Sequence, residues 1–120
     1  MSTKFVVYGE PASKANSRKL VSFKRKGGGS RPAFIKSEKA RNYNELFQQQ
    51  CPRLSPLIEG DVSVTITIYY ASRRPDLDES VILDAMQGFV YLNDRQVKEK
   101  HIFWGLDKER PRAEIIVEQL

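Results

Sequence analysis

The 120-residue sequence has one cysteine, one histidine and no apolar run near the ~20 residues that a membrane-spanning helix needs. A single cysteine, Cys51, excludes an internal disulfide framework and a cysteine-rich zinc site, and we expect it to be a small buried hydrophobe. The one histidine, His101, is expected to be an ordinary sheet or surface residue. The N-terminus lacks a signal-peptide pattern. These absences predict an intracellular protein without a membrane segment, and the length fits one domain over residues 1–120.

Acidic residues are almost missing from residues 14–41, where Glu38 stands against ten Lys or Arg. The segment carries +9 and the whole chain +5, so the remainder carries −4. A basic segment followed by acids is typical of an enzyme that acts on polyanions, although a solvated basic loop remains the alternative. The cations expected to contact a phosphate backbone are Lys14, Arg18, Lys19, Lys24, Arg25, Lys26, Arg73 and Arg74. The glycine-rich stretch 27–29 among them is either a phosphate-binding tip or a bare hairpin turn.

The hydrophobic periodicity predicts strands separated by two helices. Strands are expected at residues 5–8, 20–23, 33–35, 62–70, 96–106 and 113–118. One helix is expected from an N-cap at Ser37 to Gln50, with Leu46 at the centre of its buried stripe. A second is expected from Asp78 to Gln87, ended by Gly88. This order predicts an α+β fold with a single mixed β-sheet and two main helices packed against it.

Two carboxylates, Asp76 and Asp78, lie where the strand at 62–70 leads into the second helix, and Asp94 precedes the next strand. Carboxylates are ligands that Mg²⁺ prefers, with waters and substrate phosphates completing its shell. The acids at this corner could therefore hold a metal, with Arg73 and Arg74 beside a phosphate. Helix-capping and turn acids are the alternative interpretation. Asp84 points away from the apolar stripe of its helix, toward solvent or toward the metal.

Several short motifs in a fixed order resemble the RusA-type family of Holliday-junction resolvases, small phage and bacterial endonucleases. The motifs that carry the resemblance are Tyr8–Ala15, Asp76-Leu77-Asp78, Asp84-Ala85-Met86, Gly88, Asn93-Asp94 and Gln96-Val97. The resemblance covers nearly the whole chain and is strongest over residues 73–97.

The resemblance implies a homodimer that binds four-way DNA junctions and resolves them by paired symmetric nicks in recombination and repair. It implies Mg²⁺, for which Mn²⁺ can substitute, and by position Asp76, Asp78 and Asp94 correspond to the catalytic metal-binding carboxylates. It also implies a cytoplasmic location, in a bacterial cell or a phage-infected host. Flaps, forks or other branched phage DNA are alternative substrates, and a junction-binding protein with lost catalysis is another interpretation.

The sequence departs from the family pattern in the segment from Asp76 to Asp84, which is shorter, and in the second helix, which lacks the lysine thought to assist catalysis. Glu79 replaces a usual Asn, and with Asp84 and Lys98 it is a candidate to act beside the metal ligands. Arg74 or Lys98 is expected to substitute partly for the missing lysine. The apolar contact of the dimer is expected to include Phe89, Tyr91 and Phe103.

Overall fold

The alternating segment at residues 62–70 forms β4 (Val62–Tyr70), which pairs with a neighbouring strand on each side along nearly its whole length. A computed structural model describes residues 2–11, 18–24, 30–36, 38–75 and 77–120, and for 18–24 and 30–36 it describes the backbone alone. Every second β4 side chain is buried, while the residues between them are half-buried. The sequence thus places one face of this strand against the core, as its period of two predicts.

Three further strands join β4 in a mixed sheet. They are β1 (Ser2–Tyr8), β5 (Val97–Leu106) and β6 (Arg112–Gln119), and the order is β1-β6-β4-β5. β6 runs antiparallel to both β1 and β4, whereas β5 runs parallel to β4. A parallel pair needs a crossover connection, which here contains the second helix. In the part of the chain that the structure describes, β1 and β5 are therefore the edges of this sheet.

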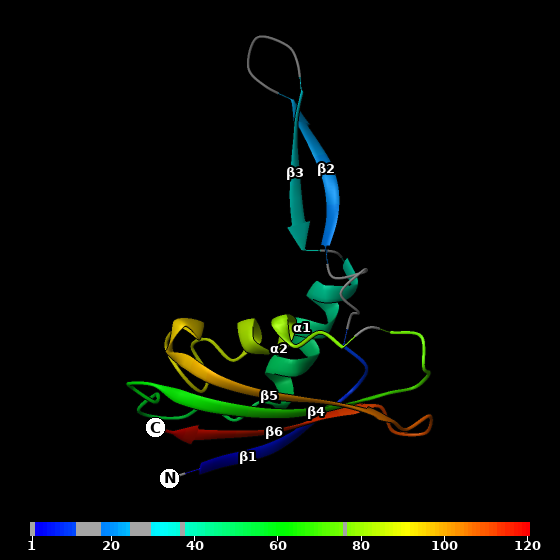
Figure 1. The fold of residues 1–120 in the computed structure, drawn as a ribbon. Coiled ribbons are helices and arrows are strands. Elements are labelled where there is room, and N and C mark those ends of the chain that lie inside the picture. Colours follow the sequence, from blue (N-terminus) through cyan, green and yellow to red (C-terminus); the bar gives the residue numbers. More distant parts are fainter. Residues whose placement is uncertain (1, 12–17, 25–29, 37, 76) are drawn as a thin grey trace.

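Both helices, α1 (Glu38–Gln50) and α2 (Ser80–Ala85), lie on the same face of the sheet (Figure 1). α1 buries Ala40, Tyr43 and Phe47, whose spacing of three and four residues places them on one stripe. Leu46, expected at the centre of this stripe, is 40% exposed, so that prediction is wrong. It lies about 100° around the helix from Phe47 and leans instead against Gly9, whose φ of +118° suits glycine.

The second helix is shorter than the predicted range 78–87 because local hydrogen bonds replace helical ones at both of its ends. On its N-terminal side, the Asp78 carboxylate accepts the backbone N–H of Ser80 at 3.0 Å. At its other end the N–H of Gln87 donates to the carbonyl of Asp84, three residues back. Gly88, predicted to end the helix, lies three residues beyond Ala85 and has a φ of +81°, a left-handed conformation that keeps the chain from continuing as a helix.

The strands β2 (Arg18–Lys24) and β3 (Ser30–Lys36) form a separate antiparallel hairpin. Arg18 pairs with Lys36 at its base and Lys24 with Ser30 at its far end. Figure 1 shows this ribbon projecting past the helices and away from the four-stranded sheet. The hairpin therefore carries part of the basic segment well outside the body of the molecule.

The predicted class, α+β with a mixed sheet and two helices against it, is confirmed. The first two short strands predicted after β1 pair with each other rather than with the main sheet. Ser37, the expected N-cap of α1, lies outside the described residues. Neither helix in the described ranges has the length and apolar character that crossing a membrane would require.

Candidate functional site

Asp78 is the one buried charged residue among the described side chains, with 6% of its surface exposed. Its Oδ1 accepts hydrogen bonds from the N–H of Ser80 at 3.0 Å and from the Ser80 hydroxyl at 2.7 Å. Its Oδ2 is also buried and has no hydrogen-bond partner within the described part of the chain. Oδ1 thus binds Ser80, the first residue of α2, which is close to the helix-capping role given above as the alternative. Oδ2 is left available to a cation. A buried carboxylate oxygen without a donor is costly unless a ligand satisfies it.

The hydroxyl of Tyr70, at the end of β4, accepts the backbone N–H of Asp78 at 3.4 Å. Burial raises the pKa of Tyr70 to about 12; the Asp78 N–H opposes this rise, and the negative charges of Asp78, Glu10 and Glu79 reinforce it. Glu10 reaches the same place from the N-terminal segment, where its Oε2 accepts the N–H of Ala71 at 3.2 Å. Acids from two distant parts of the sequence therefore gather around one buried tyrosine, which stays protonated at neutral pH.

A lysine from the edge strand β5 contacts this acidic group. Lys100 Nζ lies 3.0 Å from Glu79 Oε1. Lys100 pairs with Val64 across the β4–β5 ladder, and Ile102 and Trp104 pair with the buried Ile66 and Ile68. Residues paired in adjacent strands share a face, so Lys100 lies on the helix-covered face. The sequence interpretation favoured Lys98 or Arg74 as the nearby cation, and neither forms an ion pair in the described residues.

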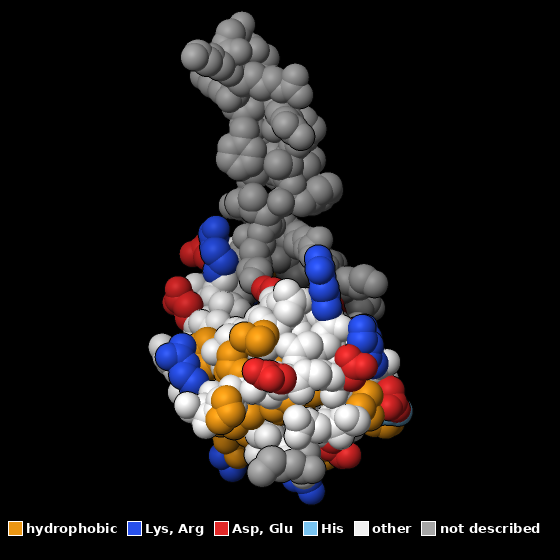
Figure 2. All heavy atoms as spheres, turned by 90° about the vertical axis from the view of Figure 1, so that its left-hand side faces the viewer, with side chains coloured by type: hydrophobic (Ala, Val, Ile, Leu, Met, Phe, Trp, Pro, Cys, Tyr) orange, Lys and Arg blue, Asp and Glu red, His pale blue; other side chains and the backbone are white. Residues whose placement is uncertain are grey.

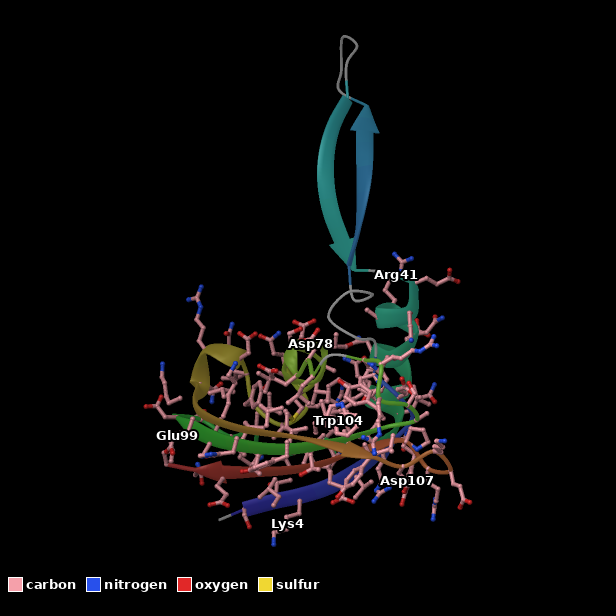
Figure 3. All side chains as sticks on the ribbon, turned by 45° about the vertical axis from the view of Figure 1, so that its right-hand side comes forward. Lys4, Arg41, Asp78, Glu99, Trp104 and Asp107 are labelled. Carbon is pink, nitrogen blue, oxygen red and sulfur yellow. The ribbon has the colours of Figure 1, made fainter. Side chains whose placement is uncertain are left out.

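The aromatic ring of Trp104 lies over Tyr70, with ring centroids 6.3 Å apart and planes 30° apart. Trp104 is 39% exposed. Figure 3 labels both Trp104 on β5 and Asp78 near the start of α2, on the helix side of the sheet. The partly exposed ring of Trp104 therefore contacts the tyrosine whose hydroxyl accepts the backbone N–H of Asp78.

Asp94 begins a short 3₁₀ turn, η2 (Asp94–Gln96), that leads into β5. Asn93 caps this turn, its side chain accepting the N–H of Arg95 at 2.9 Å. The side chain of Asp94 is exposed. Capping holds the backbone of the turn and leaves the Asp94 carboxylate directed outward rather than used as the cap.

A glutamine connects the two remaining acids of the predicted site. Gln87 Nε2 donates to Asp84 Oδ1 at 2.8 Å, and Gln87 Oε1 accepts the backbone N–H of Asp94 at 3.1 Å. Burial raises the pKa of Tyr91, and the nearby charges of Asp94 and Asp84 raise it further. Asp84 therefore helps fix the turn that presents Asp94. Gln87 was missed because its role depends on contacts between separate elements, and a lone glutamine in a sequence carries no such signal.

Gln96 forms four hydrogen bonds that tie the Asp94 turn to the preceding loop. Its Oε1 accepts the N–H groups of Leu92 and Asn93, each at 3.0 Å. Its Nε2 donates to the carbonyls of Ile58 and Gly60 at 2.9 and 2.8 Å. A primary amide can satisfy donors and acceptors at once, which explains why a glutamine suits this position. The Gln-Val motif thus has a structural role in positioning Asp94.

Replacing Gln96 by alanine is expected to lower the free energy of unfolding by about 1–3 kcal/mol, because backbone groups on both sides of the side chain lose their partners. Urea denaturation followed by circular dichroism would measure it. The matched control is Gln49→Ala, since Gln49 is an exposed glutamine on the outer side of α1. Equal stabilities of the two variants would contradict the proposed tie.

Several predicted site residues lie outside the part of the chain whose side chains the structure describes. Asp76, Lys14, Arg25 and Lys26 lie outside the described residues, and for Arg18, Lys19 and Lys24 the backbone alone is described. Arg73 and Arg74 are exposed on the segment between β4 and Asp78. Within the described ranges, which omit Asp76, no three His, Cys, Asp or Glu side chains form a group that could hold a metal ion. The proposed set of Asp76, Asp78 and Asp94 therefore stays a prediction.

The aromatic residues expected at a dimer contact differ in their exposure. Tyr91 is fully buried, and its hydroxyl donates to the carbonyl of Leu83, so its assignment to a surface contact is wrong. Phe89 is half-buried, with the guanidinium of Arg53 4.6 Å from its ring centroid. Phe103 is 54% exposed and remains a candidate. Burial of Cys51 raises its pKa to about 12, in agreement with an inert buried thiol.

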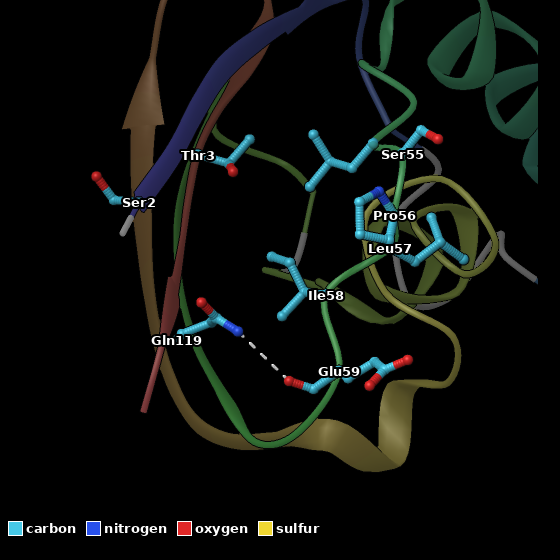
Figure 4. Close-up of a pocket in the computed structure, with 9 residues that line it drawn as sticks. Ser2, Thr3, Ser55, Pro56, Leu57, Ile58, Glu59 and Gln119 are labelled. Carbon is cyan, nitrogen blue, oxygen red and sulfur yellow. Dashed lines mark hydrogen bonds between the residues drawn. The ribbon is translucent and has the colours of Figure 1, made fainter.

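A cleft of about 550 Å³ lies elsewhere, between the loop at residues 54–59 and the ends of β1 and β6 (Figure 4). Leu54 and Ile58 line it, and Gln119 donates across its edge to the carbonyl of Glu59 at 3.5 Å. Glu59 is the one ionisable residue among those that line it. Figure 2 shows acidic and basic side chains mixed over this end of the body, so it offers no broad cationic surface for a polyanion.

The comparison with family models gives the class of this protein. The model of the family described as endodeoxyribonuclease RusA matches residues 9–118. Because the match covers almost the whole chain, the protein belongs to the RusA endodeoxyribonuclease family, and the resemblance predicted from the sequence is confirmed. A comparison with curated proteins found no significant match. The chain is thus assigned to a nuclease class through its family.

Proposed function

We propose that this protein is a Mg²⁺-dependent endonuclease that resolves four-way DNA junctions by paired symmetric nicks. The observation that carries the proposal is the buried Asp78, whose Oδ2 has no partner among the described residues, in a chain of an endodeoxyribonuclease family. This oxygen fits a hard cation, since carboxylates are preferred ligands of Mg²⁺. Asp76 and Asp94 are proposed as the other ligands, and Mn²⁺ is expected to substitute.

The protein's own groups have separable tasks in this proposal. Asp78 is oriented by Ser80 and Tyr70, so its free oxygen has a fixed direction. Asp94 is oriented by a capped turn and by Gln87. A bound Mg²⁺ would supply activation of water and neutralisation of charge on the phosphate. Preorganised ligands raise the efficiency of such a site because they need no rearrangement during the reaction.

DNA affinity is proposed to come from the basic hairpin and from Arg73 and Arg74. The region from 18 to 36 contains seven Lys or Arg and no acid. An antiparallel ribbon of two strands can follow a nucleic-acid groove or track the phosphates along it. Because the ribbon projects away from the body, its far end could contact DNA at a distance from the carboxylates.

The test of the function is cleavage of a synthetic four-way junction with and without Mg²⁺, beside flap and fork substrates of the same arm sequences. We expect paired nicks at symmetric positions on the junction and slower cutting of flaps and forks. If a flap or fork is cleaved faster than the junction, that branched DNA rather than the four-way junction is the preferred substrate. Binding without cleavage over a full titration of Mg²⁺ and Mn²⁺ would instead identify a junction-binding protein with lost catalysis.

A homodimer is proposed because a four-way junction has two-fold symmetry and needs two cuts. The edge strand β5 exposes consecutive large side chains on both of its faces, Phe103 and Trp104, followed by Leu106 at 37%. An uncovered edge with apolar side chains is a surface that pairs with another strand. A second copy of the chain placed edge to edge would extend both sheets and cover these residues.

Replacing Phe103 by aspartate is expected to halve the mass measured by light scattering at micromolar concentration, because it places charges against each other across the two-fold axis. The control is Val6→Asp on the opposite edge strand β1, where Val6 is 38% exposed. A monomeric wild-type protein that makes paired nicks would contradict the dimer. Dissociation by Val6→Asp alone would move the contact to β1.

A further inference from the structure

Lys100 occupies a position that stability alone explains poorly. Its ammonium group lies 3.0 Å from Glu79, and the two side chains are 49% and 23% exposed. Exposed ion pairs typically contribute about 0.2–1 kcal/mol, because water screens the charges and ordering two side chains costs entropy. On the same face of β5, the next alternate residues are the apolar Ile102 and Trp104. Lys100 therefore lies in line with apolar residues, and its ion pair with Glu79 adds little to the stability of the fold.

The acids around Tyr70 make a nearby cation useful. Asp78, Glu10 and Glu79 all place negative charge near the Tyr70 hydroxyl, where the Asp78 N–H and the Glu10 side chain also form hydrogen bonds, the first to Tyr70 and the second to the next residue, Ala71. A DNA phosphate that approaches this corner would be repelled by them, since juxtaposed like charges are unfavourable. Within the described part of the chain, Lys100 is the cation that forms an ion pair with this group. The Lys100 side chain is 49% exposed, and a phosphate can therefore reach it.

Lys98 lies on the same strand but in a different setting. Val62 pairs with Val97 and Ser63 with Glu99, so Lys98 is the extra residue of a β-bulge. Because of this bulge, the usual alternation of side chains along a strand does not put Lys98 on the same face as Lys100. Lys98 is exposed and forms no ion pair in the described ranges. It therefore provides a matched control: the same residue type, two positions away, without the contact.

We propose that Lys100 is a catalytic residue that contacts the scissile phosphate. This inference rests on the nuclease function proposed above. Glu79 holds the ammonium group beside Asp78 while DNA is absent, and the phosphate takes over this contact when DNA binds. A fixed cation at this place opposes negative charge that grows on the phosphate during the reaction, which lowers the barrier. Lys100 thus supplies from β5 the positive charge that α2 lacks.

The experiment compares Lys100→Ala, Lys100→Arg, Lys98→Ala and Glu79→Gln with the wild type. Single-turnover cleavage of the four-way junction is measured with saturating protein and Mg²⁺, and junction affinity is measured in EDTA over a salt series. Lys100→Ala is expected to cut about a hundredfold more slowly. Its log–log salt slope should fall by about 0.9, the value for one lost phosphate contact. Arginine should restore much of the rate, and Lys98→Ala should match the wild type.

Glu79→Gln separates the phosphate contact from a structural ion pair. Glutamine keeps an acceptor for Lys100 and leaves the lysine in place, so the proposal expects cleavage closer to wild type than for Lys100→Ala. Equal losses in these two variants, or equal rates for Lys100→Ala and Lys98→Ala, would overturn the proposal. If the wild type cuts no branched DNA, the nuclease function fails. In that case the salt slope of Lys100→Ala against Lys98→Ala still tests the phosphate contact.

Discussion

Asparagine in place of Asp78 is expected to reduce single-turnover cleavage of a four-way junction at least about a hundredfold, with little change in junction affinity. The asparagine side chain has nearly the same shape as aspartate and can still accept the Ser80 N–H and hydroxyl through its remaining oxygen. The change removes the negative charge that faces a cation and leaves the hydrogen bonds to the start of α2 in place. Loss of activity would therefore come from the site rather than from unfolding.

The control for this experiment is Asp61→Asn. Asp61 is an exposed aspartate at the start of β4, at the opposite end of the strand from Tyr70. It should cut at the wild-type rate, and both variants should keep the wild-type melting temperature. Because a negative charge near DNA is removed, Asp78→Asn can bind the junction slightly more tightly. A variant at Asp78 that cuts as fast as the control would exclude this carboxylate as a metal ligand.

The second large effect is expected from the hairpin. Replacing Lys24, Arg25 and Lys26 together by alanine should lower the log–log salt slope of junction binding by about 2.7, since each neutralised phosphate contact contributes about 0.9. Affinity at low salt should fall at least about tenfold, equally for junctions of different sequence, because phosphate contacts carry no sequence information. Fluorescence anisotropy of a labelled junction over a salt series measures both quantities.

Lys4→Ala combined with Lys108→Ala provides the control for the hairpin variant. Both lysines are exposed, one on β1 and one in the turn before β6, away from the hairpin. Their removal should leave the slope unchanged. If the hairpin variant also keeps the wild-type slope, then the far end of the β2–β3 ribbon is outside the DNA interface. In that case Arg73 and Arg74 would be the next cations to replace.

The sequence alone predicted the elements whose hydrophobic pattern is regular. β4 begins and ends at the predicted residues, β5 begins one residue later than predicted, and β6 extends one residue further at each end. Alternation along a strand is a local property, since each side chain faces the side opposite to its neighbour. The family was predicted in the same way, from motifs that are contiguous in the sequence, and its match over residues 9–118 confirms it.

Tertiary structure decided which polar groups meet. Glu10 joins Asp78 and Glu79 around Tyr70 although more than half of the sequence separates it from them. A bulge at Lys98 removes this lysine from the alternation that continues to Lys100, because one extra residue reverses the faces of the residues counted across it. The sequence favoured Lys98, whereas in the structure the ion pair with Glu79 is formed by Lys100.

Burial was also decided at the level of packing. Tyr91 precedes a turn and was expected at the dimer contact, but its side chain is buried and its hydroxyl donates to the Leu83 carbonyl. The spacing of Leu46 puts it on the apolar stripe of α1, but its side chain lies at the edge of the core and is 40% exposed. Spacing determines the face of an element to which a residue belongs. Which residues of that face are buried depends on the elements that pack against it, and this is a property of the assembled fold.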